Sequence, residues 1–239
     1  MPRPSVSLSL AVMLAAPAAF GAGITSPADP AKRATFDILA AEASRDGDAV
    51  TFRMTLAATA GSERPAPVGA LAGAPVHAYV WPTSLDPATV GFEGGTGILA
   101  LAATSHPDFD DTPLEDEDSD GDPKNDGGPW HSHWVVLTPS EECGPGALSV
   151  RDIPEGETPA LPKTWPGLPL FIDSPGYVPA LDADTVAVTV TLQGAPADIG
   201  FDGVTSALRV NANVHAPLLC VTDVFDVASG DLSLPGKVE

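Results

Sequence analysis

The segment Ala49-Val-Thr-Phe-Arg-Met-Thr-Leu56 alternates apolar and polar side chains from Val50 to its end. A period of two places one set of side chains on the buried face of a β-strand and the other set on the opposite face. Directly before it stands Arg45-Asp-Gly-Asp48, whose Asp-Gly pair is a strong signal for a β-hairpin. This region therefore predicts two antiparallel strands joined by a tight turn.

The rest of the chain repeats such segments and contains no convincing amphipathic helix. Alternating or wholly apolar runs lie at Val76–Trp81, Gly97–Thr104, Trp130–Leu137, Gly146–Ile153, Thr185–Leu192, Leu208–Val214 and Leu218–Phe225. Roughly ten short strands at this spacing are typical of antiparallel sandwiches and barrels. We therefore expect an all-β fold, a single antiparallel β-sandwich or partly open barrel over residues 30–239. A long acidic loop at residues 106–129 interrupts it, and we expect little helix outside a signal peptide at residues 1–22.

Charge and composition narrow the classes of function. The chain has 11 Lys and Arg against 32 Asp and Glu, a formal net charge of −21. Phosphate repels such a surface, which excludes direct nucleic-acid binding and disfavours docking on anionic lipid. Because 44% of the residues are hydrophobic, the chain is not a disordered acidic protein. Metal cations are its natural partners.

The first 22 residues have the three parts of a secretory signal peptide. Arg3 supplies a positive start, Ser5–Phe20 is apolar, and small residues follow. Cleavage is expected between about residues 18 and 23. No later segment is long and apolar enough to span a bilayer, so we expect no stable membrane insertion after cleavage. The predicted location is periplasmic or extracellular, most simply in a bacterium.

The two cysteines, Cys143 and Cys220, are predicted to form a disulfide. An exported protein meets an oxidising compartment, and the pair shows no CxxC spacing of the metal-binding kind. The two residues are 77 positions apart. Closing a loop that long contributes roughly 4–5 kcal/mol in the chain-entropy account. Free thiols or thiolate ligands to a metal are the alternatives.

Ten of the acidic residues lie in one loop between Asp108 and Asp126. Its centre, Asp116-Glu-Asp-Ser-Asp-Gly-Asp122, resembles the start of the calcium loops of EF-hands, dockerins and thrombospondin type-3 repeats. The resemblance implies a Ca²⁺ site, because a tight turn at glycine lets alternate oxygen ligands converge. The twelfth position is Gly127 rather than glutamate, so only the ligand pattern carries over. The candidate ligands are Asp116, Asp118, Asp120, Asp122 and Asp126, and a solvated acidic loop is the alternative.

The histidines suggest a second metal site. His131-Ser-His133 begins a predicted strand, so both imidazoles lie on the same face. His77 and His215 each lie on the polar side of another alternating strand, and an H-x-H pair with distant histidines commonly holds Zn²⁺ or Cu²⁺. The acidic loop runs from His106 to the H-x-H pair and can fold over such a site, with a carboxylate as a further ligand. We predict a transition-metal site at His77, His131, His133 and His215, and ordinary surface histidines are the alternative.

The segment His131-Ser-His133-Trp134 resembles the H-x-H-W strand of α-class carbonic anhydrases. That family places a third histidine on a nearby strand soon afterwards. In this chain no histidine follows until His215, so we do not expect membership of that family.

Three tryptophans lie on the same segments as the histidines. Trp81, Trp130 and Trp134 are either core side chains or an aromatic platform for a sugar ring.

The sequence as a whole predicts an exported metal-binding β-sandwich protein that handles metal or uses it to stabilise a binding fold. A carbohydrate- or surface-binding module with structural calcium, whose partner is a glycan or a protein, is the first alternative. A metal-dependent enzyme is the second, although no catalytic residues are assigned.

Overall fold

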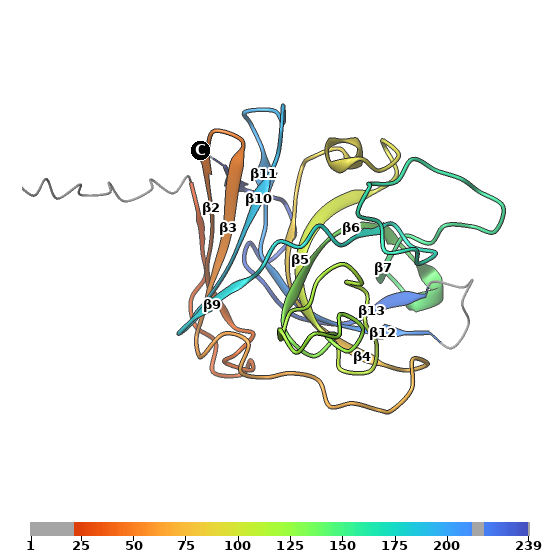
Figure 1. The fold of residues 1–239 in the computed structure, drawn as a ribbon. Coiled ribbons are helices and arrows are strands. Elements are labelled where there is room, and N and C mark those ends of the chain that lie inside the picture. Colours follow the sequence, from red (N-terminus) through yellow and green to blue (C-terminus); the bar gives the residue numbers. More distant parts are fainter. Residues whose placement is uncertain (1–21, 212–217, 239) are drawn as a thin grey trace, which may run out of the picture.

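In the computed structural model, which describes residues 22–211 and 218–238, the chain forms antiparallel β-sheets almost throughout (Figure 1). Helix in these residues is confined to two 3-10 turns, η1 (Pro87–Val90) and η2 (Glu141–Cys143). The all-β prediction is therefore confirmed. None of the helices in the described residues is long and apolar enough to cross a membrane. The predicted signal peptide lies outside the described residues except for Ala22.

The first sheet has five strands in the order β1-β2-β3-β10-β9. Its strands are β1 (Ile24–Thr25), β2 (Ile38–Asp46), β3 (Ala49–Leu56), β9 (Ala180–Asp182) and β10 (Thr185–Thr191). The predicted hairpin joins β2 to β3, with Asp46 paired to Ala49. Gly47 has a φ of 61° at the first position of this turn, a conformation that glycine adopts without strain.

The second sheet closes on itself as a barrel. Six strands follow one another in the order β5-β4-β12-β13-β7-β6, and β6 pairs back to β5. They are β4 (Pro75–Pro82), β5 (Ile98–Ser105), β6 (His131–Pro139), β7 (Leu148–Val150), β12 (Val204–Val210) and β13 (Leu219–Val227). A short strand, β8 (Ile172–Asp173), adds to β6 beside β7. A separate two-stranded ribbon consists of β11 (Gly200–Phe201) and β14 (Gly236–Lys237).

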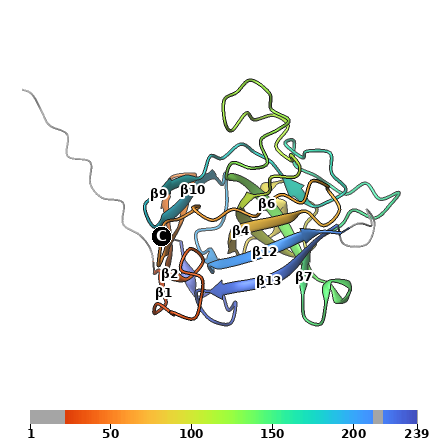
Figure 2. The ribbon, with the colours of Figure 1, turned by 90° about the horizontal axis from the view of Figure 1, so that it is seen from below.

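The five-stranded sheet and the barrel pack together as two layers (Figures 1 and 2). The main core lies between the inner face of β2, β3 and β10 and the outer face of β4, β5 and β6. Phe52 on β3, for example, contacts the ring of Trp81 on β4 with 6.3 Å between centroids. Val186, Val188 and Val190 are buried there, as their alternation predicts. The sandwich therefore uses the wall of the barrel as its second layer.

Strand β4 contributes to a core on each of its two faces. Val76, Ala78 and Val80 belong to a second core inside the barrel. Tyr79 and Trp81 belong to the sandwich core. The side of this strand that carries His77 is consequently not the polar side expected from the alternation.

The predicted disulfide is present between Cys143 and Cys220, with Cα atoms 5.5 Å apart. Cys143 ends η2 in the connection from β6 to β7, and Cys220 lies on β13. Between β7 and β13 the register contains only the pair Ser149 and Cys220. The bond therefore reinforces the weakest seam of the barrel covalently.

Candidate metal centre

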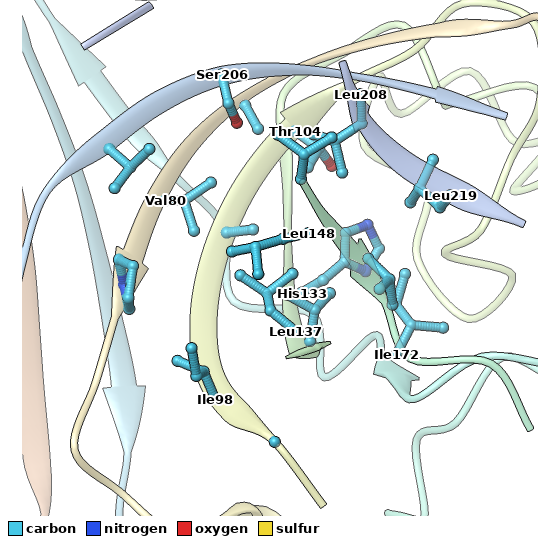
Figure 3. Close-up of a pocket in the computed structure, with 18 of the residues that line it drawn as sticks. Val80, Ile98, Thr104, His133, Leu137, Leu148, Ile172, Ser206, Leu208 and Leu219 are labelled. Atoms are coloured by element: carbon cyan, nitrogen blue, oxygen red, sulfur yellow. The ribbon is translucent and has the colours of Figure 1, made fainter. Parts of the chain in front are cut away.

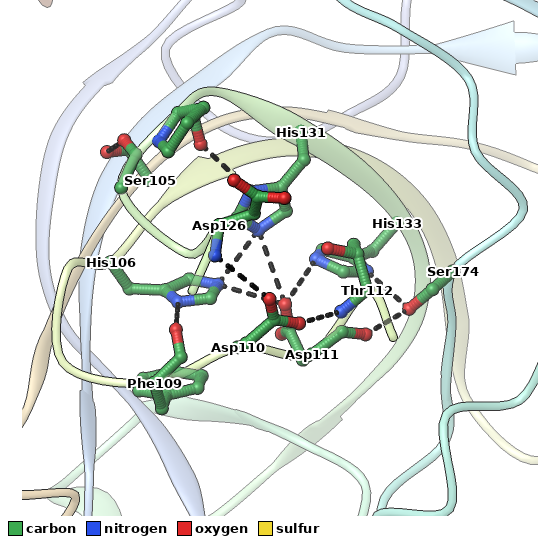
Figure 4. A network of polar contacts seen from close by, with 12 residues as sticks. Ser105, His106, Phe109, Asp110, Asp111, Thr112, Asp126, His131, His133 and Ser174 are labelled. Carbon is green, nitrogen blue, oxygen red and sulfur yellow. Dashed lines mark hydrogen bonds and ion pairs between the residues drawn. The ribbon is translucent and has the colours of Figure 1, made fainter. Parts of the chain in front are cut away.

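Strands β5 and β6 and the acidic loop between them bring four potential metal ligands together. His133 lies opposite Ala102 and His131 lies opposite Thr104, so the two histidines share the inner face of the barrel. The loop leaves β5 at His106 and returns to β6 at His131. It folds back over this end of the barrel and adds Asp111 to the group (Figure 4).

The four donor atoms lie as close to one another as ligands of a single ion. Asp111 Oδ1 lies 3.1 Å from His106 Nε2, 3.3 Å from His131 Nε2 and 3.2 Å from His133 Nε2. The Nε2 atoms of His106 and His131 are 2.9 Å apart. A tetrahedral ion with bonds of about 2.0–2.1 Å separates its ligands by about 3.3–3.4 Å. The group is therefore close to the size of a tetrahedral coordination shell.

The other nitrogen of each imidazole fixes the tautomer. His106 Nδ1 donates to the carbonyl of Phe109 at 3.0 Å, and His131 Nδ1 donates to the carbonyl of Pro129 at 2.9 Å. His133 Nδ1 faces the carbonyl of Asp173 at 3.3 Å. A carbonyl oxygen only accepts, so each neutral ring has its proton on Nδ1 and a lone pair on Nε2.

A second hydrogen bond from His133 ties β6 to the loop. Its Nδ1 lies 3.2 Å from Ser174 Oγ, and that hydroxyl donates to the backbone carbonyl of Asp111 at 2.6 Å. Such outer partners orient ligating side chains and fix their distance from the metal. Ser174 thus holds the strand ligand and the loop ligand in one arrangement.

The centre is buried and carries uncompensated lone pairs. All four side chains are buried, and Asp111 Oδ1 and His133 Nε2 have no hydrogen-bond partner among the described residues. Burial by itself raises the pKa of Asp111, whereas positive charge on the facing imidazoles of His106 and His133 lowers that pKa well below its usual value. When the imidazoles are neutral, their three lone pairs and the carboxylate converge in a dry site, and a bound cation would supply the positive charge that stabilises them.

Gly127 allows the loop to close over the centre. Its carbonyl accepts from the backbone nitrogen of His106 at 2.7 Å. A Cβ at this position would lie 1.7 Å from the carbonyl oxygen of Phe109 and 2.9 Å from His106 Nδ1. Only glycine fits there, so the loop depends on this residue to place His106.

The acidic loop holds a second group of oxygens. Carboxylate atoms of Asp116, Asp118 and Asp126 lie within 4.8 Å of one another. Asp126 is fully buried, and its Oδ1 has no hydrogen-bond partner among the described residues. Glu117 lies beside it, and burial raises the pKa of that carboxyl group. An unpaired buried carboxylate in an acidic group is expected where a cation binds.

The structure does not bring the other two predicted calcium ligands into this group. Asp120 Oδ1 accepts from the backbone nitrogen of Asp122, and its Oδ2 accepts from Asn125. These two hydrogen bonds hold the pKa of Asp120 below its usual value, and the one from Asn125 has the larger effect. The side chain of Asp120 thus shapes the turn rather than completing the group.

Of the predicted histidine ligands, the structure unites His131 and His133 but not His77. His77 pairs with Ser105 on the opposite face of the sheet, and its ring contacts Phe36 at 5.1 Å between centroids. Burial lowers its pKa, which favours the neutral form. His215 lies outside the described residues.

The three tryptophans of the predicted platform are all buried. Trp81, Trp130 and Trp134 belong to the sandwich core, and Trp130 Nε1 donates to the carbonyl of Gly61 at 3.0 Å. None of these rings offers an exposed face for stacking on a sugar. They are core side chains, which is the other role that the sequence predicted for them.

Sequence reasoning assigned no ligand role to His106 or Asp111. The expectation that the acidic loop folds over the H-x-H pair and supplies a carboxylate agrees with the geometry, but it did not single out which carboxylate. One clue could have assigned a ligand role to His106. It follows directly after β5, the strand that pairs with the H-x-H strand β6.

Comparisons with known proteins add no relative to this picture. A scan against models of protein families found no match, and neither did searches of curated proteins and of solved structures.

Proposed function

We propose that this chain is an exported zinc-binding β-barrel protein in which the metal stabilises a binding fold. The proposal is carried by one observation, the convergence of three Nε2 lone pairs and Asp111 Oδ1 at distances of 2.9–3.3 Å. Zn²⁺ accepts tetrahedral nitrogen and oxygen ligands, whereas Cu²⁺ prefers tetragonal arrangements. Four protein ligands are typical of a structural zinc site.

In this proposal zinc fastens the acidic loop to the barrel. Two of its ligands, His106 and Asp111, belong to the loop, and the other two lie on β6. The ion therefore closes one end of the barrel, because it joins the acidic loop to β6, which hydrogen bonds alone hold together only in part. Export is supported by the signal-peptide pattern and by the disulfide, which is typical of oxidising compartments.

We further propose that Ca²⁺ binds at Asp116, Asp118 and Asp126 and orders the same loop. The two sites are connected through Asp110, which neighbours the zinc ligand Asp111. Its carboxylate accepts from the backbone nitrogen of Asp126 at 3.0 Å and from that of Thr112 at 2.8 Å. Calcium bound at Asp126 therefore stabilises the backbone that presents Asp111.

Elemental analysis of the mature protein, purified from an exporting host without chelator, tests both sites. We expect close to one zinc per chain, lost in His131→Ala and retained in the matched control His77→Ala. Calcium should be lost in Asp126→Asn and retained in Asp223→Asn, which removes an exposed carboxylate elsewhere. Equal zinc content in the two histidine variants, or no zinc in the wild type, would refute the zinc assignment.

A further inference from the structure

The barrel encloses a cavity of about 410 Å³ that runs along its interior (Figure 3). Small-molecule sites in proteins occupy about 300–1,000 Å³. The space exists because inward positions of the neighbouring strands β4 and β5 carry small side chains, Ala78 and Ala102, where larger ones would fill the barrel. The cavity is therefore encoded in the sequence of these strands.

The walls of the cavity are aliphatic, and so is its rim. Val80, Val135 and Val204 line it from three different strands. At the rim, Ile98, Val224 and Leu232 remain 41%, 55% and 41% exposed. Apolar side chains gathered around the mouth of an apolar cavity are expected where an apolar ligand enters.

One level of the cavity is polar. The hydroxyl side chains of Ser206 and Thr104 flank Ala78 at this level, across β12, β4 and β5. Thr104 lines the cavity, and its Oγ1 is buried with no hydrogen-bond partner among the described residues. An unpaired hydroxyl in an apolar chamber is costly unless a ligand completes its hydrogen bonds.

The charge of the lining selects a neutral ligand. The described residues that line the cavity include no Lys or Arg, whereas Asp86 and Asp111 both line it. The whole chain carries a net charge of −21, which also repels anions. A carboxylate or phosphate head group would find no Lys or Arg to pair with, and the lining imidazoles of His106 and His133 already face Asp111.

We propose that the barrel binds a small aliphatic molecule with a single neutral oxygen head group, a hydroxyl or a carbonyl. The head hydrogen-bonds to Thr104 near the closed end, and the aliphatic part extends toward the mouth at Ile98 and Leu232. This site goes beyond the zinc centre, which closes the end of the barrel but is not required to contact the ligand.

Displacement of a neutral fluorescent probe, N-phenylnaphthylamine, by decanol tests the cavity on the mature metal-loaded protein. Val204→Phe fills the cavity from β12, away from the metal ligands, and should weaken decanol binding at least ten-fold. Val80→Phe is the second variant, should the first fail to fold. Val178→Phe is the matched control, since Val178 is 80% exposed and lies outside the cavity. Unchanged decanol affinity in a folded cavity variant would overturn the proposal.

The head group is tested by a second pair of measurements. Thr104→Val keeps the shape of the side chain but removes the hydroxyl, and should weaken decanol binding about five-fold. Decanoate should bind more weakly than decanol to the wild type at neutral pH. Tighter binding of decanoate than of decanol, or an unchanged decanol affinity in Thr104→Val, would refute a neutral head group that hydrogen-bonds to Thr104.

The zinc content of every variant is measured alongside, which separates this proposal from the previous one. Decanol binding that is lost in Val204→Phe supports the cavity site even if the protein proves to contain no zinc. Conversely, if the protein contains zinc but both cavity variants bind decanol as tightly as the wild type, the zinc proposal stands and the cavity proposal is refuted.

Discussion

At the scale of single residues, Tyr79 shows how burial creates a dependence on pH. Its hydroxyl accepts from the backbone nitrogen of Gly61 at 2.9 Å and donates to the carbonyl of Thr35 at 3.2 Å. Burial raises the pKa of this phenol to about 12. The folded state therefore holds the proton more tightly than the unfolded state, whose tyrosine pKa is about 10. The resulting stability is fully present below pH 10 and is lost as the pH rises toward 12.

Tyr79→Phe should remove this dependence. We expect the difference in unfolding free energy between wild type and variant to shrink as the pH rises from 9 to 12. At pH 7 the variant should be about 1 kcal/mol less stable, because two partly buried hydrogen bonds are lost. Urea unfolding of both proteins across this range checks the prediction, and a difference that does not vary with pH would contradict it.

Gly127 gives the second prediction at this scale. Gly127→Ala should displace the loop and abolish zinc binding, because its Cβ would overlap the carbonyl oxygen of Phe109. The matched control is Gly128→Ala, since a Cβ at Gly128 meets no atom within 4 Å. Zinc titration followed by calorimetry compares the two variants. Equal zinc affinity in both would show that the loop does not need the close approach.

Part of the centre was predictable from residues alone. The H-x-H spacing places His131 and His133 on one face, because strand side chains alternate strictly. His77 was misplaced because alternation cannot tell a solvent face from a second core, and β4 has a core on each side. Asp111 could not be chosen among the ten acids of its loop, since an irregular loop has no periodicity that fixes its path.

At the scale of elements, the seam of the barrel depends on β7. This strand of three residues meets β13 at a single residue pair, and the Cys143–Cys220 bond spans the same place. The individual strands were predictable from alternation and turn residues. Closure of the ring was not, because it depends on pairing between β6 and β5 and on a strand too short to give a clear pattern.

Replacing both Cys143 and Cys220 with serine should destabilise the protein by roughly 2–5 kcal/mol, given the 77-residue separation. The double variant avoids a free thiol. Amide hydrogen exchange should show the largest loss of protection on β7 and the facing part of β13, with β2 and β3 less affected. Uniform loss of protection, or an unchanged unfolding free energy, would contradict a local role for the bond.

At the scale of the whole molecule, β4, β5 and β6 serve the two layers at once. Their outer faces complete the sandwich core, and their inner faces line the barrel. The acidic loop between β5 and β6 closes one end of that barrel, and the exposed aliphatic rim marks the other. A wall packed on both faces is suited to holding metal ligands in fixed positions.

The most direct test of the proposed zinc centre is diffraction at the zinc absorption edge from crystals of the mature protein, grown without added metal. We predict an anomalous peak at about 2.0–2.2 Å from Nε2 of His106, His131 and His133 and from Asp111 Oδ1. An absence of anomalous density between these four side chains, or zinc held by other residues, would contradict the account.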